Sequence, residues 1–125
     1  MLRMAAKVFG VVFIAIGLLG FVPALAPDDN LLGLFHINAA HNWVHIASGV
    51  VALIAGFYNV AAAKIYFQVF GVVYGLVAVL GFAYGDQPIL GFIASNFADT
   101  LLHIVIAAAA LYFGFGSPAQ EKAAA

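Results

Sequence analysis

Two short stretches of the chain carry the side chains whose types and spacing suit chemistry. Residues 38–45 read Asn-Ala-Ala-His-Asn-Trp-Val-His, and residues 96–103 read Asn-Phe-Ala-Asp-Thr-Leu-Leu-His. In each stretch the first, fourth and eighth positions carry polar groups that bind protons or metal ions. Offsets of three and seven residues fall along one face of a helix. Each stretch therefore predicts a polar stripe on a helix: Asn38, His41 and His45 in the first, and Asn96, Asp99 and His103 in the second.

These stripes predict a metal site. His41 and His45 are four residues apart, a spacing at which two imidazoles on one helix can share an ion. Asp99 and His103 occupy the matching positions of the second stretch. Three imidazoles and one carboxylate suit zinc or another first-row divalent metal. We expect the neighbouring polar residues to cap the helices or to orient the rings, and the nearby loop to offer one additional candidate ligand; these residues are Asn38, Asn42, Asn96, Thr100 and, in the loop, His36.

Three other interpretations compete with the metal site. In a purely structural one, His41 and Asp99 form a hydrogen-bonded ion pair that locks the helices, and the helix dipole favours the Asp99 anion. In the second, a b-type haem is held between His45 and His103, which leaves His41 and Asp99 without a role. The third is a proton or small-ligand site that opens outward. No arrangement of residues identifies a nucleophile, so the sequence does not predict an enzyme.

Composition decides the class of protein. Of 125 residues, 66% are hydrophobic and 7% are charged, against roughly a quarter charged in soluble domains. Each helical crossing of a bilayer needs about 20 apolar residues, so four crossings use the whole chain as a single membrane domain, residues 1–125. The absence of cysteine excludes disulfides and thiolate metal sites, and a net charge of -1 gives no patch for nucleic acid. The expected partner is the lipid bilayer, with a homo-oligomer or a larger membrane complex as its setting.

Four apolar runs predict the helices that position the stripes. The first covers residues 8–25, and the others cover about 38–57, 64–84 and 96–115. Residues 58–63 are expected to connect the two middle helices. Residues 31–37 and 89–95 are apolar but short and contain glycine, so we expect them to lie near the membrane surface without forming strands. Residues 117–125 are predicted to be a polar tail.

An internal repeat relates the two halves. The sequence Val-Phe-Gly-Val-Val occurs at 8–12 and again at 69–73, and Leu-Gly-Phe occurs at 19–21 and at 80–82. The first repeat covers about 7–58 and the second about 64–115. Because each unit crosses the membrane twice, the copies enter from the same side and are related by a pseudo-two-fold axis along the membrane normal. The predicted fold is an all-α four-transmembrane-helix bundle made of two parallel helical hairpins.

The distribution of charge predicts the orientation. All four basic residues fall at the termini or in the middle connection, whereas three acidic residues fall in the other two loops; the basic ones are Arg3, Lys7, Lys64 and Lys122, and the acidic ones are Asp28, Asp29 and Asp86. The positive-inside rule then places both termini in the cytoplasm and the polar stripes near the outer leaflet. Small residues continue each stripe along its helix, which indicates that the stripes face protein rather than lipid.

The repeated polar element also carries a resemblance to a known family. Asn38-x-x-His41-Asn42-x-x-His45 precedes a glycine-containing apolar helix, and Asn96-x-x-Asp99-x-x-x-His103 follows later. With these motifs the chain, over roughly residues 5 to 115, resembles small bacterial four-helix membrane proteins of a domain-of-unknown-function (DUF) family with an Asn-x-x-His-Asn-x-x-His element. The resemblance implies a four-helix membrane fold and a location in the bacterial inner membrane. It implies no particular activity.

Overall fold

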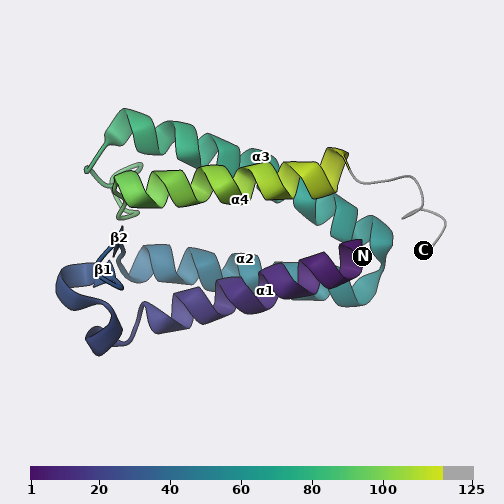
Figure 1. The fold of residues 1–125 in the computed structure, drawn as a ribbon, viewed down its shortest axis with the longest axis horizontal. Helices are drawn as coiled ribbons and strands as arrows, with labels where there is room; N and C mark the ends of the chain where they lie inside the picture. Colours follow the sequence, from purple (N-terminus) through teal and green to yellow (C-terminus); the bar gives the residue numbers. More distant parts are fainter. Residues whose placement is uncertain (117–125) are drawn as a thin grey trace.

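The fold is an all-α bundle of four helices, seen in a computed structural model that describes residues 1–116 (Figure 1). The helices are α1 (Leu2–Leu19), α2 (Ala39–Tyr58), α3 (Val60–Tyr84) and α4 (Phe97–Phe115). All four are long and apolar enough to cross a membrane. The predicted four-helix membrane fold is therefore confirmed. The predicted tail, residues 117–125, lies outside the described residues.

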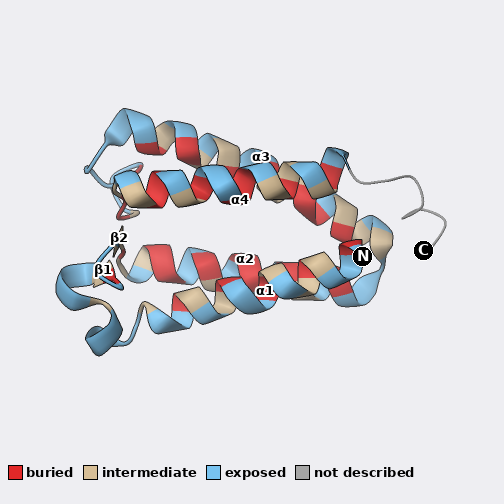
Figure 2. Ribbon diagram, in the orientation of Figure 1, coloured by how far each residue is buried: buried red, intermediate tan, exposed pale blue. Residues whose placement is uncertain are grey.

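The helices pair as two hairpins, α1 against α2 and α3 against α4, which lie side by side (Figure 1). Buried residues follow the helix faces that meet (Figure 2). One apolar cluster, which includes Leu2, Ala63 and Phe67, lies at the end where α2 joins α3. A second cluster contains Phe13 and Tyr74 and lies further along the bundle. The outward faces carry large apolar side chains, as lipid-facing helices do.

Two helix boundaries differ from the sequence prediction. The helix α3 begins at Val60 rather than at Lys64, and the connection to α2 is the single residue Asn59. The Asn59 side chain accepts a hydrogen bond from the Ala62 amide at 2.7 Å, and such a cap together with a run of alanines favours an earlier helix start. The second difference is the end of α1, which lies at Leu19 and not at residue 25, where the apolar run ends. Pro23 starts a short 3-10 turn there, η1 (Pro23–Leu25).

The loop between α1 and α2 contains a small hairpin that the sequence analysis did not predict. After a second turn, η2 (Pro27–Asp29), strand β1 (Asn30–Leu31) pairs antiparallel with β2 (Phe35–His36). The Leu32 and Gly33 backbones between the strands have positive φ angles, which suits a tight turn. The loop between α3 and α4 repeats the feature, because Ile89 forms an isolated bridge with Ile93 around a second Leu-Gly pair of positive φ. The expectation that no strand forms was wrong for residues 31–37, whereas residues 89–95 contain only the isolated bridge.

Two asparagines cap helices and also join the two hairpins. Asn38 Oδ1 accepts the His41 amide at 2.9 Å, and Asn96 Oδ1 accepts the Asp99 amide at 2.9 Å, so both predicted caps are present. The side-chain NH2 groups of the same asparagines bond to the opposite hairpin: Asn38 Nδ2 donates to Phe92 O at 2.8 Å, and Asn96 Nδ2 donates to Leu34 O at 2.9 Å. These reciprocal bonds tie the loop ends of the hairpins together, where the polar stripes begin. The duplication and its two-fold axis stay a prediction.

Candidate metal centre

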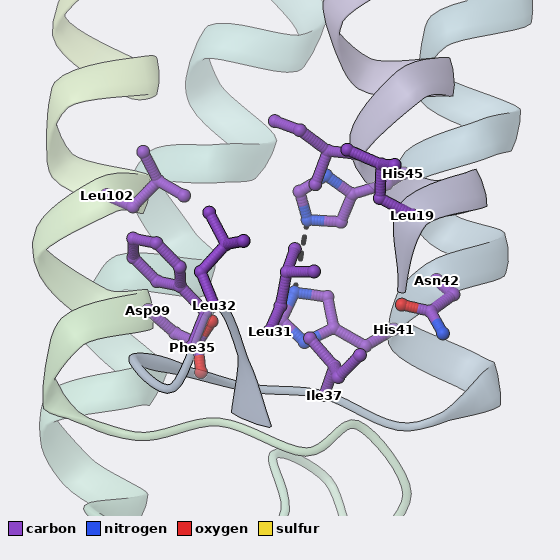
Figure 3. A pocket seen from close by; sticks show the side chains of 11 residues that line it. Leu19, Leu31, Leu32, Phe35, Ile37, His41, Asn42, His45, Asp99 and Leu102 are labelled. Atoms are coloured by element: carbon purple, nitrogen blue, oxygen red, sulfur yellow. Dashed lines mark hydrogen bonds between the residues drawn. The ribbon is translucent and has the colours of Figure 1, made fainter. Parts of the chain in front are cut away.

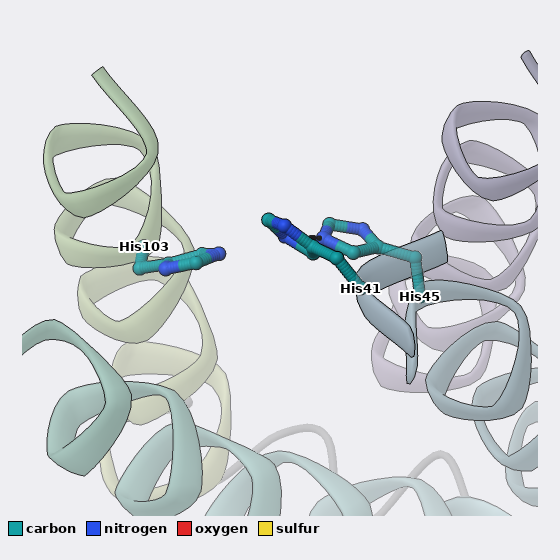
Figure 4. A group of neighbouring side chains, drawn as sticks. All are labelled: His41, His45 and His103. Carbon is teal, nitrogen blue, oxygen red and sulfur yellow. Dashed lines mark hydrogen bonds between the residues drawn. The ribbon is translucent and has the colours of Figure 1, made fainter. Parts of the chain in front are cut away.

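Three histidines from the two hairpins meet inside the bundle (Figure 4). His41 and His45 lie on α2, and His103 lies on α4. One ligand atom from each lies within 4.8 Å of the others, and each residue is at least 96% buried. His41 Nε2 and His45 Nε2 lie 3.1 Å apart. We refer to these three residues as the histidine cluster.

The helix starts place the histidine cluster, and aromatic rings surround it. The Asn38 cap begins α2 so that positions 41 and 45 share the buried face. The Phe13 ring lies 5.6 Å from His45 between centroids, and the Tyr74 ring lies 5.7 Å from His103. Tyr74 Oη in turn donates to Ser48 Oγ at 3.1 Å. These wall residues were not predicted, since aromatic residues in an apolar helix carry no sequence signal that distinguishes a site wall from ordinary packing.

Asp99 does not belong to the histidine cluster. Its Oδ2 accepts the Asn96 amide at 3.0 Å, completing a capping box at the start of α4, and the backbone of His36 lies beside the same carboxylate. No ion pair joins His41 to Asp99 in the part of the chain that the structure describes, so the pair expected in the structural interpretation was wrong. The physical reason is local: a carboxylate in the first helical turn satisfies the free amides of its own helix.

Three further candidates have packing contacts or hydrogen bonds outside the histidine cluster. Asn42 packs against Gly20 of α1, and Thr100 packs against Gly81 of α3, where in each case a Cβ on the glycine would collide with the polar side chain. Thr100 Oγ1 also donates to Asn96 O at 3.2 Å. His36 lies in β2, and its Nδ1 donates to Asp29 O at 3.2 Å. The structure therefore places Asn42 and Thr100 in helix packing and His36 in the loop.

The histidine cluster has unsatisfied hydrogen-bonding capacity. Four buried side-chain atoms within residues 1–116 have no hydrogen-bond partner, and three of them are the Nδ1 atoms of the cluster. The backbones of His36 and Ala94 lie near the His41 ring, but neither completes a bond to Nδ1. An unpaired buried polar atom costs about 1–3 kcal/mol, so the three Nδ1 atoms leave the histidine cluster with room for further hydrogen-bond partners.

The geometry fits a shared metal ion. Imidazole nitrogens about 2 Å from a tetrahedral centre lie about 3.3 Å from one another, close to the 3.1 Å between His41 and His45. The ligand nitrogen of His103 lies within 4.8 Å of those of His41 and His45. A short movement of the His103 side chain would bring its nitrogen to the same separation of about 3.3 Å. Three neutral imidazoles suit zinc, copper, iron or nickel.

Comparison with known proteins gives a family and nothing more specific. A family model described as Domain of unknown function (DUF4383) matches residues 3–116. No curated protein and no solved structure matches the chain.

Proposed function

The chain belongs to the DUF4383 family, and we propose that it is a small integral membrane protein that binds one divalent first-row metal ion, zinc first among them. The ligands are His41, His45 and His103. One observation supports this most strongly: buried ligand atoms from both hairpins lie within 4.8 Å of one another. Asp99, the one buried carboxylate among the described residues, lines the cavity beside the cluster, but its carboxylate is bonded to the Asn96 amide, so the proposed site does not include it.

An ion accounts for the histidine cluster better than a haem does. A macrocycle between His45 and His103 would need free space around both rings, yet the His41 ring lies 5.7 Å from His103 and 4.9 Å from His45 between centroids. Phe13 and Tyr74 occupy the flanks of the same two rings. A single ion needs no such space.

The second candidate function is a structural or accessory membrane subunit whose polar cluster only locks the helices. The bond between His41 and His45 favours it, since two neutral imidazoles can pair without any ion. So does Ser48, which accepts hydrogen bonds from Tyr66 at its carbonyl and from Tyr74 at its hydroxyl, joining α3 to α2. A lock of this kind predicts no affinity for metal.

Metal analysis of protein purified without a histidine tag separates the two functions. The metal site predicts one zinc ion per chain after titration, and release of that ion on acidification, because protons compete for the imidazole nitrogens. Zinc bound at less than one ion per ten chains after add-back, with the helical spectrum intact, would leave only the structural lock.

We also propose a bacterial inner-membrane location with both termini in the cytoplasm. Arg3 donates to the carbonyls of Gly56 and Phe57 at the end of α2, and the Lys7 ammonium lies 4.4 Å over the Phe57 ring. Basic residues therefore gather at the end opposite the Asp28 and Asp86 loops, as the positive-inside rule requires of a cytoplasmic face. The histidine cluster then lies toward the outer leaflet.

Cysteine labelling tests the orientation on a clean background, because the chain contains no cysteine. In intact cells, a membrane-impermeant maleimide should label an Asp86→Cys variant, whose loop faces outward. A Tyr58→Cys variant, exposed at the opposite end, should be labelled only after the membrane is permeabilised. The reverse pattern would contradict the proposed orientation.

A further inference from the structure

A cavity of about 200 Å³ lies between the two hairpins beside the histidine cluster (Figure 3). Its walls are mainly leucine, isoleucine and phenylalanine side chains from α1, from the β1–β2 region and from α4, including Leu19, Leu31, Phe35 and Leu102. Concave, mostly apolar sites with a few polar groups are the common form of small-molecule sites in proteins. The cavity therefore has the general form of a site for a lipophilic ligand.

Polar groups with unused hydrogen-bonding capacity line the same cavity. His41 and His45 stand on one side and Asp99 on the other (Figure 3). Asp99 is 2% exposed, and its carboxylate accepts the Asn96 amide and lies beside the His36 backbone. A carboxylate offers about four acceptor sites, so this one can receive another donor. The Nδ1 atoms of both histidines are unpaired as well.

We infer that this cavity binds a single-ring lipophile that carries a hydroxyl group, chemically a phenol or the head ring of a hydroquinone. The ring occupies the apolar space, and its hydroxyl donates to the Asp99 carboxylate. The volume suits one ring, because an apolar cavity of about 150 Å³ in another protein is known to hold benzene. This inference rests on the cavity and on Asp99, and it goes beyond the metal site, since it requires no ion.

Other ligand classes fit the walls less well. An anionic head group would meet the Asp99 carboxylate, and like charges in a site of low polarity repel strongly. An organic cation would pair with the Asp99 carboxylate, but a buried ion pair without further hydrogen bonds gains little over the hydration that the cation gives up. A purely apolar ligand would leave the remaining acceptor sites of the buried Asp99 carboxylate unused. A neutral ring with a hydroxyl donor avoids all three costs.

Fluorine NMR on the protein in lipid nanodiscs tests the inference with three probes of similar size. We expect 4-fluorophenol to bind saturably, above its partition into empty nanodiscs, and at least about 10-fold more tightly than 4-fluorotoluene or 4-fluorobenzylamine. The Asp99→Asn variant, whose amide oxygen is a neutral and weaker acceptor, should show a smaller preference for the phenol. Equal or tighter binding of the toluene or the amine would overturn the inference.

Two tryptophan variants keep the test independent of Asp99 and of the metal. Leu102 lines the cavity, whereas its neighbour Leu101 does not and is 47% exposed. Leu102→Trp should abolish saturable binding of 4-fluorophenol, and Leu101→Trp should retain it. The same measurements on chelator-treated protein should give unchanged phenol binding, which separates this site from the metal site. Binding that survives Leu102→Trp would show that the probe sits elsewhere.

Discussion

Replacing His103 by alanine is expected to weaken zinc binding by more than about 100-fold. His103 is the histidine that the second hairpin contributes to the cluster, so its loss leaves two ligands on a single helix. Changes to groups that merely orient a ligand already cost 10–100-fold in metal affinity, and loss of a ligand itself should cost more. The measurement is a competition titration of untagged protein against a chromophoric zinc chelator.

His36→Ala is the matched control for this experiment. His36 is also an imidazole near the loop end, but its Nδ1 is bonded to Asp29 O and it lies outside the cluster. Its removal should leave zinc affinity within about twofold of the wild type. A His103→Gln variant keeps a polar side chain at the buried position and reports separately on folding. Equal zinc affinities for wild type and a folded His103→Ala protein would remove His103 from the site.

Replacing Gly49 or Gly114 by alanine is expected to destabilise the bundle by about 1–3 kcal/mol, the usual cost of overpacking a tight interface. A Cβ at Gly49 would lie 2.7 Å from Gly10 O, and one at Gly114 would lie 2.7 Å from Gln68 N. Both contacts are with backbone, which cannot turn aside as a flexible side chain can. Each helix pair would have to separate.

Gly75→Ala provides the opposite case on α3. A Cβ there meets nothing within 4 Å, and alanine is favoured over glycine in a helix by about 1 kcal/mol. This variant should therefore be at least as stable as the wild type. The three proteins can be compared by reversible unfolding in mixed micelles with increasing denaturing detergent. A Gly75→Ala variant as unstable as Gly49→Ala would show that the loss reflects glycine in general rather than close helix contact.

Features that depend on short stretches of sequence were predicted well. Four apolar runs of membrane-spanning length predicted four helices, and asparagine before each polar stripe predicted the caps at Asn38 and Asn96. Both depend only on neighbouring residues. The sequence predicts that α3 starts near the basic residue Lys64, whereas the cap formed by Asn59 sets an earlier start. The β1–β2 hairpin and the Ile89–Ile93 bridge were not predicted, because a Leu-Gly pair in an apolar segment resembles ordinary membrane sequence.

Features that depend on how the hairpins meet could be predicted only in part. The histidines at 41 and 45 share a helix face by spacing alone, and the repeat placed position 103 opposite them. Asp99 has the same spacing, yet its carboxylate accepts the Asn96 amide. Spacing alone does not reveal whether a carboxylate will cap its own helix or reach a more distant site. The cavity also forms from loop, α1 and α4 side chains together, so no single stretch of sequence indicates it.

The measurement that tests the metal site most directly is zinc-edge X-ray absorption on the untagged, zinc-loaded protein in lipid. A site made by His41, His45 and His103 predicts three imidazole nitrogens at about 2.0–2.1 Å, with the remaining position filled by oxygen. Loss of one imidazole from this shell in the His103→Ala protein should follow. A shell of oxygen atoms without imidazole scattering would contradict the account and leave the histidine cluster as a lock between helices.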